Sequence, residues 1–485
     1  MSVILQHWRQ RVEDEPYAVA LSQGQQRLTR SQLMAAVTAI ATRLRPYQGQ
    51  VLALQADNQL DWVLVDLACL EAGIVLLPLP AFFSAGQQAH AIAQSGAVAL
   101  IRDADGVSEP CAFPVTNRLV LTPVTKPALA SLPESTVKIT FTSGSTGNPK
   151  GVCLSEDNLL SVAQALLERT GLENSRHLCV LPLPTLLENV AGVYAALLSG
   201  GEVCLLPADE LGFNGSSDFN VPQWLNVLDT VRPNSMILLP GLLAALISSV
   251  QQGWQAPDSL QFVAVGGSRV GSGLLQAAKS CGLPVYEGYG LSECASVVSL
   301  NSETDHQTGS AGKPLSHIQL QIDDGEIVVS GNPFLGYVNE PESWSATEVR
   351  TGDLGFVDEQ GYLHILGRRK NLLINSFGRN INPEWIESEV LANPAIAQCV
   401  VTGDAQPFCI ALIYPRGAVE DELIDNWLQT INRDLPDYAR IRQWLRLPRP
   451  FSHAEGTLTA NGKPVRSKID ALYQSDISNL YKEQA

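Results

Sequence analysis

The stretch KITFTSGSTGNPKG, residues 138–151, is the most informative segment of the chain, because it joins a β-type run to a loop rich in hydroxyls and glycines. Glycine lets the backbone approach an anion closely, while hydroxyl and ammonium groups can donate hydrogen bonds to it. The spacing is not the GxxxxGK[ST] of P-loop nucleoside triphosphatases, so their γ-phosphate machinery is not implied. By itself the segment predicts a phosphate-binding loop, with an ordinary Gly/Ser/Thr turn as the alternative. The groups expected to bind phosphate are Thr142, Ser143, Gly144, Ser145, Thr146, Gly147, Lys150 and Gly151.

On both sides of this loop, helix-type and strand-type patterns alternate along the chain. Apolar residues at helical spacing predict helices, and short apolar runs predict strands. Such alternation is typical of α/β folds in which largely parallel sheets are covered by helices. The predicted elements are helices over 28–45, 61–72 and 85–95, strands over 51–54, 74–77 and 98–101, and a helix after the loop that Ser155 can cap.

The pattern changes twice toward the C-terminus. Residues 321–330 read as short strands joined by a turn, which indicates a small β subdomain. A run of charge over 368–370 then precedes a smaller α/β segment. We therefore expect an α/β protein with two domains. The large N-terminal domain over 1–369 would contain parallel-rich sheets flanked by helices and the small β subdomain, and a small C-terminal α/β domain would span 370–485.

Composition restricts the possible partners of this 485-residue chain. Its formal net charge of -17 would repel a nucleic-acid backbone or an anionic membrane surface. The N-terminus reaches charged residues too soon for a signal peptide, and the apolar stretch 62–80 contains Asp66 and Glu71 and is too short to cross a bilayer. We expect a cytoplasmic protein without a transmembrane segment. The nine cysteines lack CxxC or Cys/His ligand spacing and are interpreted as reduced thiols; they are Cys69, Cys111, Cys153, Cys179, Cys204, Cys281, Cys294, Cys399 and Cys409.

The whole segment 138–151 resembles the signature [YF]TSG[ST]TGxPKG of the superfamily that contains acyl-CoA synthetases, adenylation domains and luciferases. Further matches follow in the order of that family: GGS at 266–268, YGLSE at 289–293, TGD at 351–353 and GRRK at 367–370. The resemblance covers the chain from about residue 28 to 466. Within the superfamily, the sequence pattern is most similar to that of fatty acyl-CoA synthetases. It implies an enzyme that uses ATP and Mg²⁺ to convert a carboxylic acid into an acyl-AMP.

The resemblance also assigns roles to residues. It implies that Gly266, Gly267 and Ser268 pack against adenine and that Tyr289, followed by Gly290, stacks on it. By the same resemblance the Asp353 carboxylate accepts the ribose hydroxyls, which Arg368 also reaches. An aromatic plane and a hard oxygen ligand suit adenine and magnesium respectively. The catalytic group would comprise Thr142, Ser292 at the phosphates, Glu293 as the Mg²⁺ ligand, and Lys463.

Two elements of the C-terminal segment complete the match. TANGKPVR at 459–466 resembles a TxxGKxxR element, which implies that Lys463 bridges the carboxylate and the α-phosphate during adenylation. A mobile ammonium there would offset the like charges that the reaction brings together. The other element, over 376–384, resembles the loop that shapes a pantetheine tunnel and includes Phe377, Gly378, Arg379 and Asn380. In the family, a mobile C-terminal domain rotates about a hinge and so brings one or the other of these two elements to the active site. The residue that corresponds to this hinge is Lys370.

The acid is predicted from the segment around 180–201. Leu187 stands where amino-acid-activating relatives carry an aspartate, so an α-amino acid is disfavoured. Thr185 replaces a histidine that many acyl- and aryl-CoA ligases carry. A fatty acid is the first choice, with an apolar pocket that includes Leu239; the alternative is that this Leu-rich region is simply core helix. Its apolar residues are Met236, Leu238, Leu239, Leu242 and Leu243.

The acceptor is expected to be a separate thiol, because no carrier module follows residue 466. CoA is the first choice, and the phosphopantetheine of a separate acyl carrier protein is the alternative. Basic residues could meet CoA phosphates or an acidic carrier, or could form internal salt bridges; they are Arg433, Arg440, Arg442, Arg446 and Arg449. Two rival classes are an enzyme that stops at the adenylate or oxidises it, and a catalytically silent binding protein on the same fold.

Overall fold

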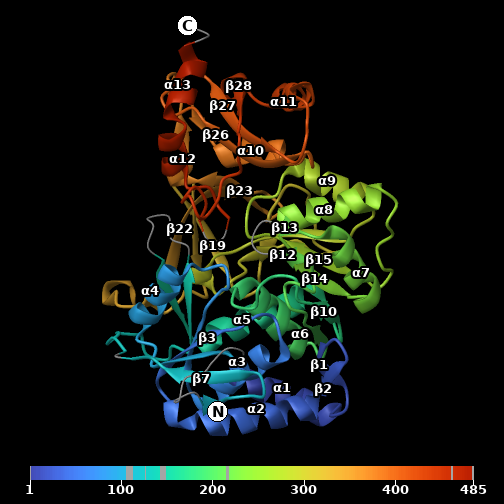
Figure 1. Cartoon of the computed structure of the whole chain (residues 1–485), viewed down its shortest axis with the longest axis vertical. Coiled ribbons are helices and arrows are strands. Elements are labelled where there is room, and N and C mark those ends of the chain that lie inside the picture. The colour runs from blue at the N-terminus through green and yellow to red at the C-terminus, as the bar shows by residue number, and fades with distance from the viewer. Residues whose placement is uncertain are drawn as a thin grey trace.

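The computed structural model describes residues 2–104, 113–125, 127–142, 149–214, 218–459 and 462–482. A large N-terminal body lies at one end and a smaller C-terminal domain at the other (Figure 1). This is the mixed α/β architecture predicted from the sequence. Among the described residues, no helix is both long and apolar enough to cross a bilayer.

Two large sheets form the interior of the N-terminal body. An eight-stranded sheet has the order β21-β9-β8-β4-β3-β5-β7-β6, and its central pairs β8/β4, β4/β3 and β3/β5 are parallel. Its strands are β3 (Val51–Gln55), β4 (Val75–Pro78), β5 (Ala99–Asp103), β6 (Phe113–Pro114), β7 (Leu119–Pro123), β8 (Lys138–Thr142), β9 (Lys150–Leu154) and β21 (Gly336–Tyr337).

The second sheet has nine strands in the order β18-β17-β16-β15-β14-β10-β11-β1-β2, parallel from β16 through β1. Its strands are β1 (Val19–Gln23), β2 (Gln26–Thr29), β10 (Arg176–Leu178), β11 (Glu202–Cys204), β14 (Ser235–Leu238), β15 (Phe262–Val265), β16 (Val285–Tyr289), β17 (Ser299–Leu300) and β18 (Lys313–Pro314). The carboxyl ends of β14, β15 and β16 meet at one edge, where parallel sheets commonly bind ligands.

Helices cover both sheets, and their capping residues explain where they begin. Thr29 and Gln32 form a capping box, so the helix predicted over 28–45 begins two residues later than expected. Ser84 and Gln87 do the same for the helix predicted over 85–95, which is confirmed at both ends. Ser155 caps the helix after the loop, also as predicted. The helices of this body are α1 (Val3–Asp14), α2 (Arg30–Leu44), α3 (Leu60–Ala72), α4 (Ala85–Ser95), α5 (Glu156–Thr170), α6 (Ala195–Leu198), α7 (Val221–Val231), α8 (Pro240–Gln251) and α9 (Ser272–Ser280).

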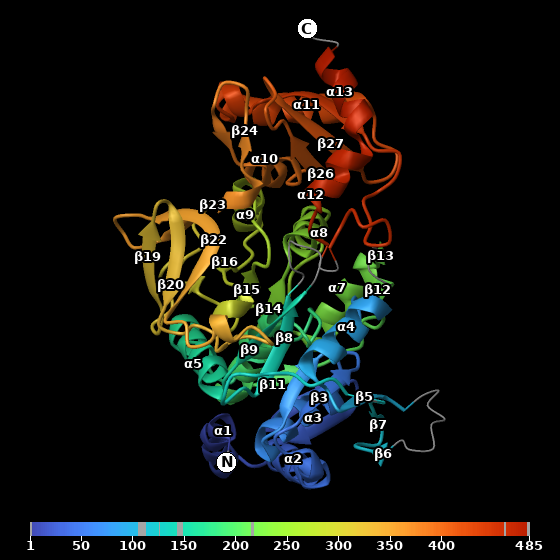
Figure 2. The ribbon, with the colours of Figure 1, turned by 90° about the vertical axis from the view of Figure 1, so that its left-hand side faces the viewer.

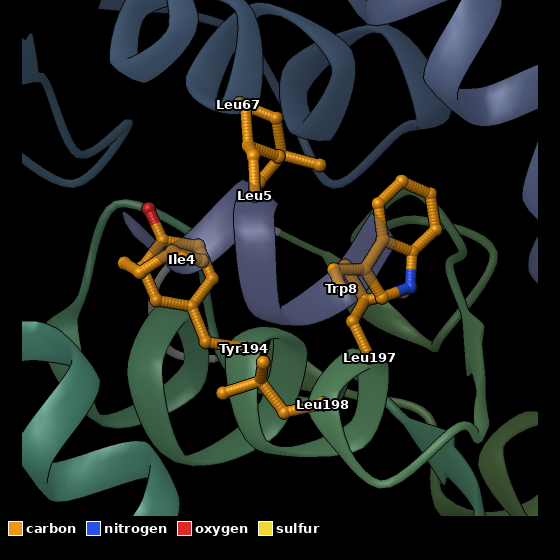
Figure 3. A pocket seen from close by; sticks show the side chains of 7 residues that line it. All are labelled: Ile4, Leu5, Trp8, Leu67, Tyr194, Leu197 and Leu198. Atoms are coloured by element: carbon orange, nitrogen blue, oxygen red, sulfur yellow. The ribbon is translucent and has the colours of Figure 1, made fainter. Parts of the chain in front are cut away.

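The N-terminal helix α1 closes the bottom of the large body. Ile4, Leu5 and Trp8 are buried against apolar residues of α3 and α6. Figure 3 shows these side chains converging with Leu67, Tyr194, Leu197 and Leu198. Burial of such large side chains contributes about 1.5–3 kcal/mol each. This contact fastens α1 to the core on the side away from the C-terminal domain (Figure 2).

The small β subdomain predicted around 321–330 is an antiparallel four-stranded sheet of β19 (Gln319–Asp323), β20 (Glu326–Ser330), β22 (Glu348–Val357) and β23 (Leu363–Arg368). A separate hairpin pairs β12 (Phe213–Asn214) with β13 (Asp218–Phe219). The C-terminal domain has its own core around β26, β27 and β28. Its elements are β24 (Leu373–Ile374), β25 (Asn380–Ile381), α10 (Pro383–Val390), β26 (Ile396–Thr402), β27 (Cys409–Pro415), α11 (Asp421–Asp434), β28 (Ile441–Arg446), α12 (Arg466–Leu472) and α13 (Gln474–Lys482).

Candidate active site

Asp353 lies at the centre of the polar groups brought together from β16, β22 and β23. Its side chain is almost wholly buried, and Arg368, its register partner on β23, contacts Oδ1 through Nε at 2.8 Å. The Tyr289 hydroxyl donates to Oδ2 at 2.7 Å. Burial raises the pKa of Asp353, opposed by Arg368 and by the Tyr289 hydrogen bond. Three residues predicted to bind a nucleotide are therefore in direct contact.

Tyr289 is held in its neutral form. Burial raises the pKa of its hydroxyl well above the usual value, and the charge of Asp353 raises it further. A neutral phenol can donate to Asp353 while its ring remains available for packing. The motif glycines beside it allow close backbone approach: a Cβ on Gly290 would lie 1.7 Å from the Ser296 carbonyl oxygen.

The predicted GGS turn lies at the carboxyl end of β15, next to Leu239. Gly267 has φ +78°, and a Cβ there would come within 3.0 Å of Leu239 Cδ2. Leu239, which follows β14 and precedes α8, keeps 42% of its surface exposed. Gly266 and Ser268 flank Gly267 on this edge, so the turn combines exposed backbone with an apolar neighbour.

Glu293 and Lys150 contact a pair of residues that the sequence did not single out. The Tyr337 hydroxyl donates to Glu293 Oε1 at 2.9 Å, and Lys150 Nζ lies 4.7 Å from the centre of the Tyr337 ring. Lys150 also forms a 2.8 Å ion pair with Glu340. Burial and the Glu293 charge raise the pKa of Tyr337. Ser292 begins the 3-10 turn η3 (Ser292–Cys294) that carries Glu293.

The glycine- and hydroxyl-rich loop itself is only partly described. Thr142 ends β8 and Lys150 begins β9, and the two residues are partners in an antiparallel register. The two residues that flank the loop, Thr142 and Lys150, therefore lie side by side. Its predicted phosphate-binding members Ser143, Gly144, Ser145, Thr146 and Gly147 lie outside the described residues.

The segment predicted to line the acyl pocket is an unusual helix. Leu187–Tyr194 form a π-helix, η2, and Thr185 precedes it with its hydroxyl donating to the Pro182 carbonyl at 2.7 Å. π-Helices are rare in proteins, and those that occur are often found at functional sites. Leu187 is half-buried and packs against the core. Within the predicted Leu-rich group, Met236, Leu238 and Leu243 are fully buried core residues, so that part of the region is core, and Leu239 is the exposed member.

A buried histidine, carboxylate and thiol hold this helix to β10 and β14. His177 lies 2.8 Å from Glu188 Oε1 and 3.0 Å from the Ser235 hydroxyl, and Glu188 Oε2 accepts the Leu181 N–H at 2.8 Å. Cys179 lies close enough that the three residues could share a metal ion, although the sequence shows no ligand spacing. The hydrogen bonds already satisfy the imidazole and carboxylate, and a Cβ on Gly192 would lie 2.5 Å from Glu188 Oε1. The cluster is therefore a structural contact.

The eight described cysteines are free thiols, and Cys111 lies outside the described residues.

A second buried network joins η2 to β8. Lys138 Nζ contacts Asp66 Oδ1 at 2.7 Å, and both side chains are 1% exposed. Lys138 also donates to Asn189 and, at 2.9 Å, to the Tyr194 hydroxyl, while both of those residues donate to Asp66. Burial lowers the pKa of Lys138, opposed by Asp66. The strand that leads into the glycine-rich loop is thereby fixed to the helix that carries Leu187.

Lys463 of the C-terminal domain acts electrostatically on Asp353, since its charge lowers the pKa of that carboxyl. The backbone of Lys463 is held in a tight turn, since its N–H donates to Thr459 Oγ1 at 3.0 Å and its carbonyl accepts the Thr459 N–H at 2.7 Å. Its side chain retains solvent access, yet desolvation lowers its pKa and Arg368 lowers it further. Asp353 and Glu384 oppose that shift. Lys370, in the turn η5 (Arg369–Asn371), also has a pKa lowered by desolvation and by Arg368.

The predicted thiol-tunnel loop is turned toward solvent. Phe377 is 73% exposed, and Gly378, Arg379 and Asn380 are exposed beside it. The loop contacts its own domain, where the Ser376 N–H donates to the Gln406 carbonyl at 3.0 Å. In this structure the charge of Lys463 lowers the pKa of Asp353, whereas the Phe377–Asn380 loop is exposed.

Sequence reasoning missed several residues of the site. Tyr337, Glu340, Arg269 and Glu287 belong to none of the family motifs, and the only signal for Glu287 is its place two residues before Tyr289. Glu287 is mostly buried, and burial raises its pKa to about 8, with Arg269 opposing. The basic residues of the C-terminal domain include two that form internal ion pairs, Arg446 with Asp421 and Arg449 with Glu455.

Comparison with known proteins agrees with this fold. The profile of the family described as AMP-binding enzyme matches residues 8–338, and that of the AMP-binding enzyme C-terminal domain matches residues 370–485. A two-domain α/β fold of this kind that carries these motifs defines an adenylate-forming type of protein. The chain belongs to the AMP-binding enzyme family.

Individual relatives are distant but cover nearly the whole chain. The long-chain-fatty-acid–CoA ligase FadD15 of Mycobacterium bovis is 26% identical, covering 90% of this chain and 88% of its own length. The 2-succinylbenzoate–CoA ligase of Bacillus velezensis is 27% identical, covering 97% and 98% respectively. The structure of O-succinylbenzoate coenzyme A synthetase (MenE) from Bacillus subtilis, in complex with AMP, superposes with a TM-score of 0.76 at 24% identity, covering 95% of this chain and 97% of that one. That likeness shows the shared fold.

Proposed function

We propose that this enzyme is an AMP-forming acid–thiol ligase that activates a fatty acid with ATP and then transfers the acyl group to CoA. The observation that carries the proposal is the Tyr289–Asp353–Arg368 contact, on which the charge of Lys463 acts from the other domain by lowering the pKa of Asp353. A binding protein would not need a cation delivered from a separate domain. The names of relatives that act on fatty and aryl acids with CoA support the reaction class.

The residues present suit ATP. Tyr289 offers an aromatic face for adenine, and the GGS turn offers the exposed backbone of Gly267. Asp353 and Arg368 offer an acceptor and a donor to the ribose, and each would exchange part of its present contact for a hydroxyl. Thr142, Lys150 and the 143–147 loop would hold the phosphates, after Lys150 leaves Glu340.

The residues also suit Mg²⁺. Glu293 supplies a hard carboxylate oxygen, which Tyr337 orients through its hydrogen bond. The related MenE of Bacillus subtilis has been solved with ATP and a magnesium ion. When bound, the metal would offset the negative charge of the phosphates.

In the first half-reaction the substrate carboxylate attacks the α-phosphorus of ATP, an acyl-AMP forms and pyrophosphate leaves. Carboxylate and α-phosphate are both negative, so their approach is unfavourable without a compensating cation. Lys463 provides that cation, and Ser292 donates a hydrogen bond in the phosphate region. These groups act most strongly on charge that concentrates in the transition state.

In the second half-reaction a thiol attacks the acyl carbon, the thioester forms, and AMP leaves. We propose that residues 1–369 and 370–485 are the two units that move, with Lys370 as the hinge. Rotation would withdraw Lys463 and bring the Phe377–Asn380 loop to the thiol path. The exposure of that loop leaves it free to take part in a second orientation.

A fatty acid suits the acyl side of the site. Leu187 and Leu239 are apolar, and Leu239 is exposed next to the GGS turn. An ammonium group buried beside them without a partner would cost several kcal/mol. α-Amino acids should therefore be poor substrates.

The test is a screen for acid-dependent pyrophosphate release, with CoA added or withheld, over medium- and long-chain fatty acids, aryl acids and amino acids. The proposal predicts the highest rate with a fatty acid and formation of its CoA thioester. A higher rate with an amino acid than with every fatty or aryl acid would overturn the substrate assignment. Thioester formed only on a carrier protein would overturn the choice of CoA.

A further inference from the structure

The two domains meet where the N-terminus of α9 faces the C-terminal end of α10. Both views place these helices next to each other (Figures 1 and 2). Glu389 of α10 accepts from the Ser272 hydroxyl at 3.1 Å and from the Ser272 N–H at 3.4 Å. Helix α9 has Gly271 at its N-cap and no capping side chain of its own there. A carboxylate from the other domain therefore takes the capping place, where the helix dipole favours negative charge.

Gly271 lets the backbone of α10 approach closely. A Cβ on Gly271 would lie 2.6 Å from the Ser388 carbonyl oxygen and 3.2 Å from its carbonyl carbon. The φ of Gly271 is -66°, which any residue can adopt. The need for glycine here thus comes from the contact with the C-terminal domain, and not from the conformation of the turn.

Arg269 adds charge to the same contact. It donates from Nη1 to the Ile365 carbonyl at 2.8 Å, which ties the loop before α9 to β23, the strand that leads to the hinge. The charges of Glu287, Glu389 and Glu384 act on it from the surrounding elements. The Arg269 guanidinium lies among carboxylates from both domains, and its positive charge therefore favours the docked arrangement of the two domains.

We infer that this contact, Gly271 and Ser272 with Ser388 and Glu389, is a docking point that holds the C-terminal domain in the orientation that brings Lys463 to Asp353. Glu389 is then a positioning residue for adenylation: it acts through the domain that carries the lysine. The inference rests on the proposed function, and it adds that the contact must open before the thiol step. Weakening it should slow the first half-reaction and spare the second.

The most direct perturbation is Gly271→Ala, because the added methyl meets the other domain's backbone only when the domains are docked. Gly273→Ala is the matched control: it is the same substitution two residues along, where a Cβ would meet Ala392 Cβ at 3.7 Å and Glu389 Oε2 at 3.9 Å, ordinary contact distances. Glu389→Gln removes the charge and keeps the shape. Glu389→Asp keeps the charge and should restore part of the loss.

Two measurements are made on each variant. The half-reactions are followed separately, as pyrophosphate release with acid and ATP and as thioester formation from preformed acyl-AMP and CoA. Gly271→Ala should slow the first about 10-fold or more and Glu389→Gln about 3-fold, with the second within about 2-fold of wild type. Gly273→Ala should match wild type in both. The rate of tryptic cleavage at residues 368–370, without substrates, should rise in Gly271→Ala and not in Gly273→Ala.

Equal loss of both half-reactions in Gly271→Ala, or equal behaviour of the two alanine variants in both measurements, would overturn the inference. Failure of the proposed function would look different, because wild type itself would then form no acyl-AMP. In that case the tryptic comparison still decides whether the docking contact exists.

Discussion

The buried Lys138–Asp66 pair offers the sharpest prediction about stability. Lys138→Met removes one charge from a pair in which both side chains are 1% exposed and whose atoms lie 2.7 Å apart. Asp66 would keep the hydrogen bonds from Asn189 and Tyr194 but would have lost its only counter-charge among the contacts described for it. Breaking a buried pair in this way costs about 3–5 kcal/mol. Because two hydrogen-bond donors to Asp66 remain, we expect the free energy of unfolding to fall by about 3 kcal/mol, the lower end of this range.

The assay is urea denaturation, followed through the buried tryptophans Trp8, Trp62 and Trp224 of the large body. Lys313→Met is the control, because its ion pair with Asp305 is partly exposed, at 31% and 39% of the two side chains, and should change the urea midpoint less than Lys138→Met. The double variant Lys138→Met/Asp66→Asn leaves no unpaired charge and should recover part of the loss. A loss under about 1 kcal/mol in Lys138→Met, or no recovery in the double variant, would refute the reasoning.

Three further predictions concern the site. Lys463→Ala should slow adenylation by roughly two to three powers of ten, measured as pyrophosphate release, while thioester formation from synthetic acyl-AMP survives; equal loss of both would remove its assigned role. Lys370→Pro fixes φ and should allow acyl-AMP to form while transfer to CoA stalls, so unchanged transfer in the folded variant would place the hinge elsewhere. Glu287 has a pKa raised from 4.5 to about 8, so between these values the folded state keeps a proton that the unfolded state has released, and this contribution to stability falls as pH rises. Thermal melting should therefore show Glu287→Gln gaining stability relative to wild type between about pH 5 and pH 8, and a constant difference would contradict the shift.

Local signals predicted much of the fold. The helix over 85–95 was predicted at its observed bounds because Ser84 caps one end and Gly96, at φ +68°, ends the other. The strand predicted over 51–54 likewise agrees with β3, Val51–Gln55, since a short apolar run leaves little choice. These features depend on neighbours in the sequence, which periodicity and capping rules describe well.

Contacts between distant residues could not be predicted in this way. The ion pair of Lys150 with Glu340 joins residues 190 positions apart, and no local pattern marks either partner. The π-helix over 187–194 has an apolar pattern that an α-helix would share. The docking of Glu389 on Ser272 depends on how two domains are oriented, which single-sequence patterns do not encode.

The central claim is that the acid is activated by adenylation, and isotope transfer tests it most directly. A fatty acid labelled with ¹⁸O in both carboxylate oxygens is incubated with ATP, Mg²⁺, CoA and the enzyme, and the nucleotide products are analysed by mass spectrometry. Attack of the carboxylate on the α-phosphorus leaves one labelled oxygen on AMP after the thiol step. We predict AMP carrying a single ¹⁸O, together with unlabelled pyrophosphate. Label in inorganic phosphate with ADP as the nucleotide product, or thioester formed with unlabelled AMP, would contradict the account.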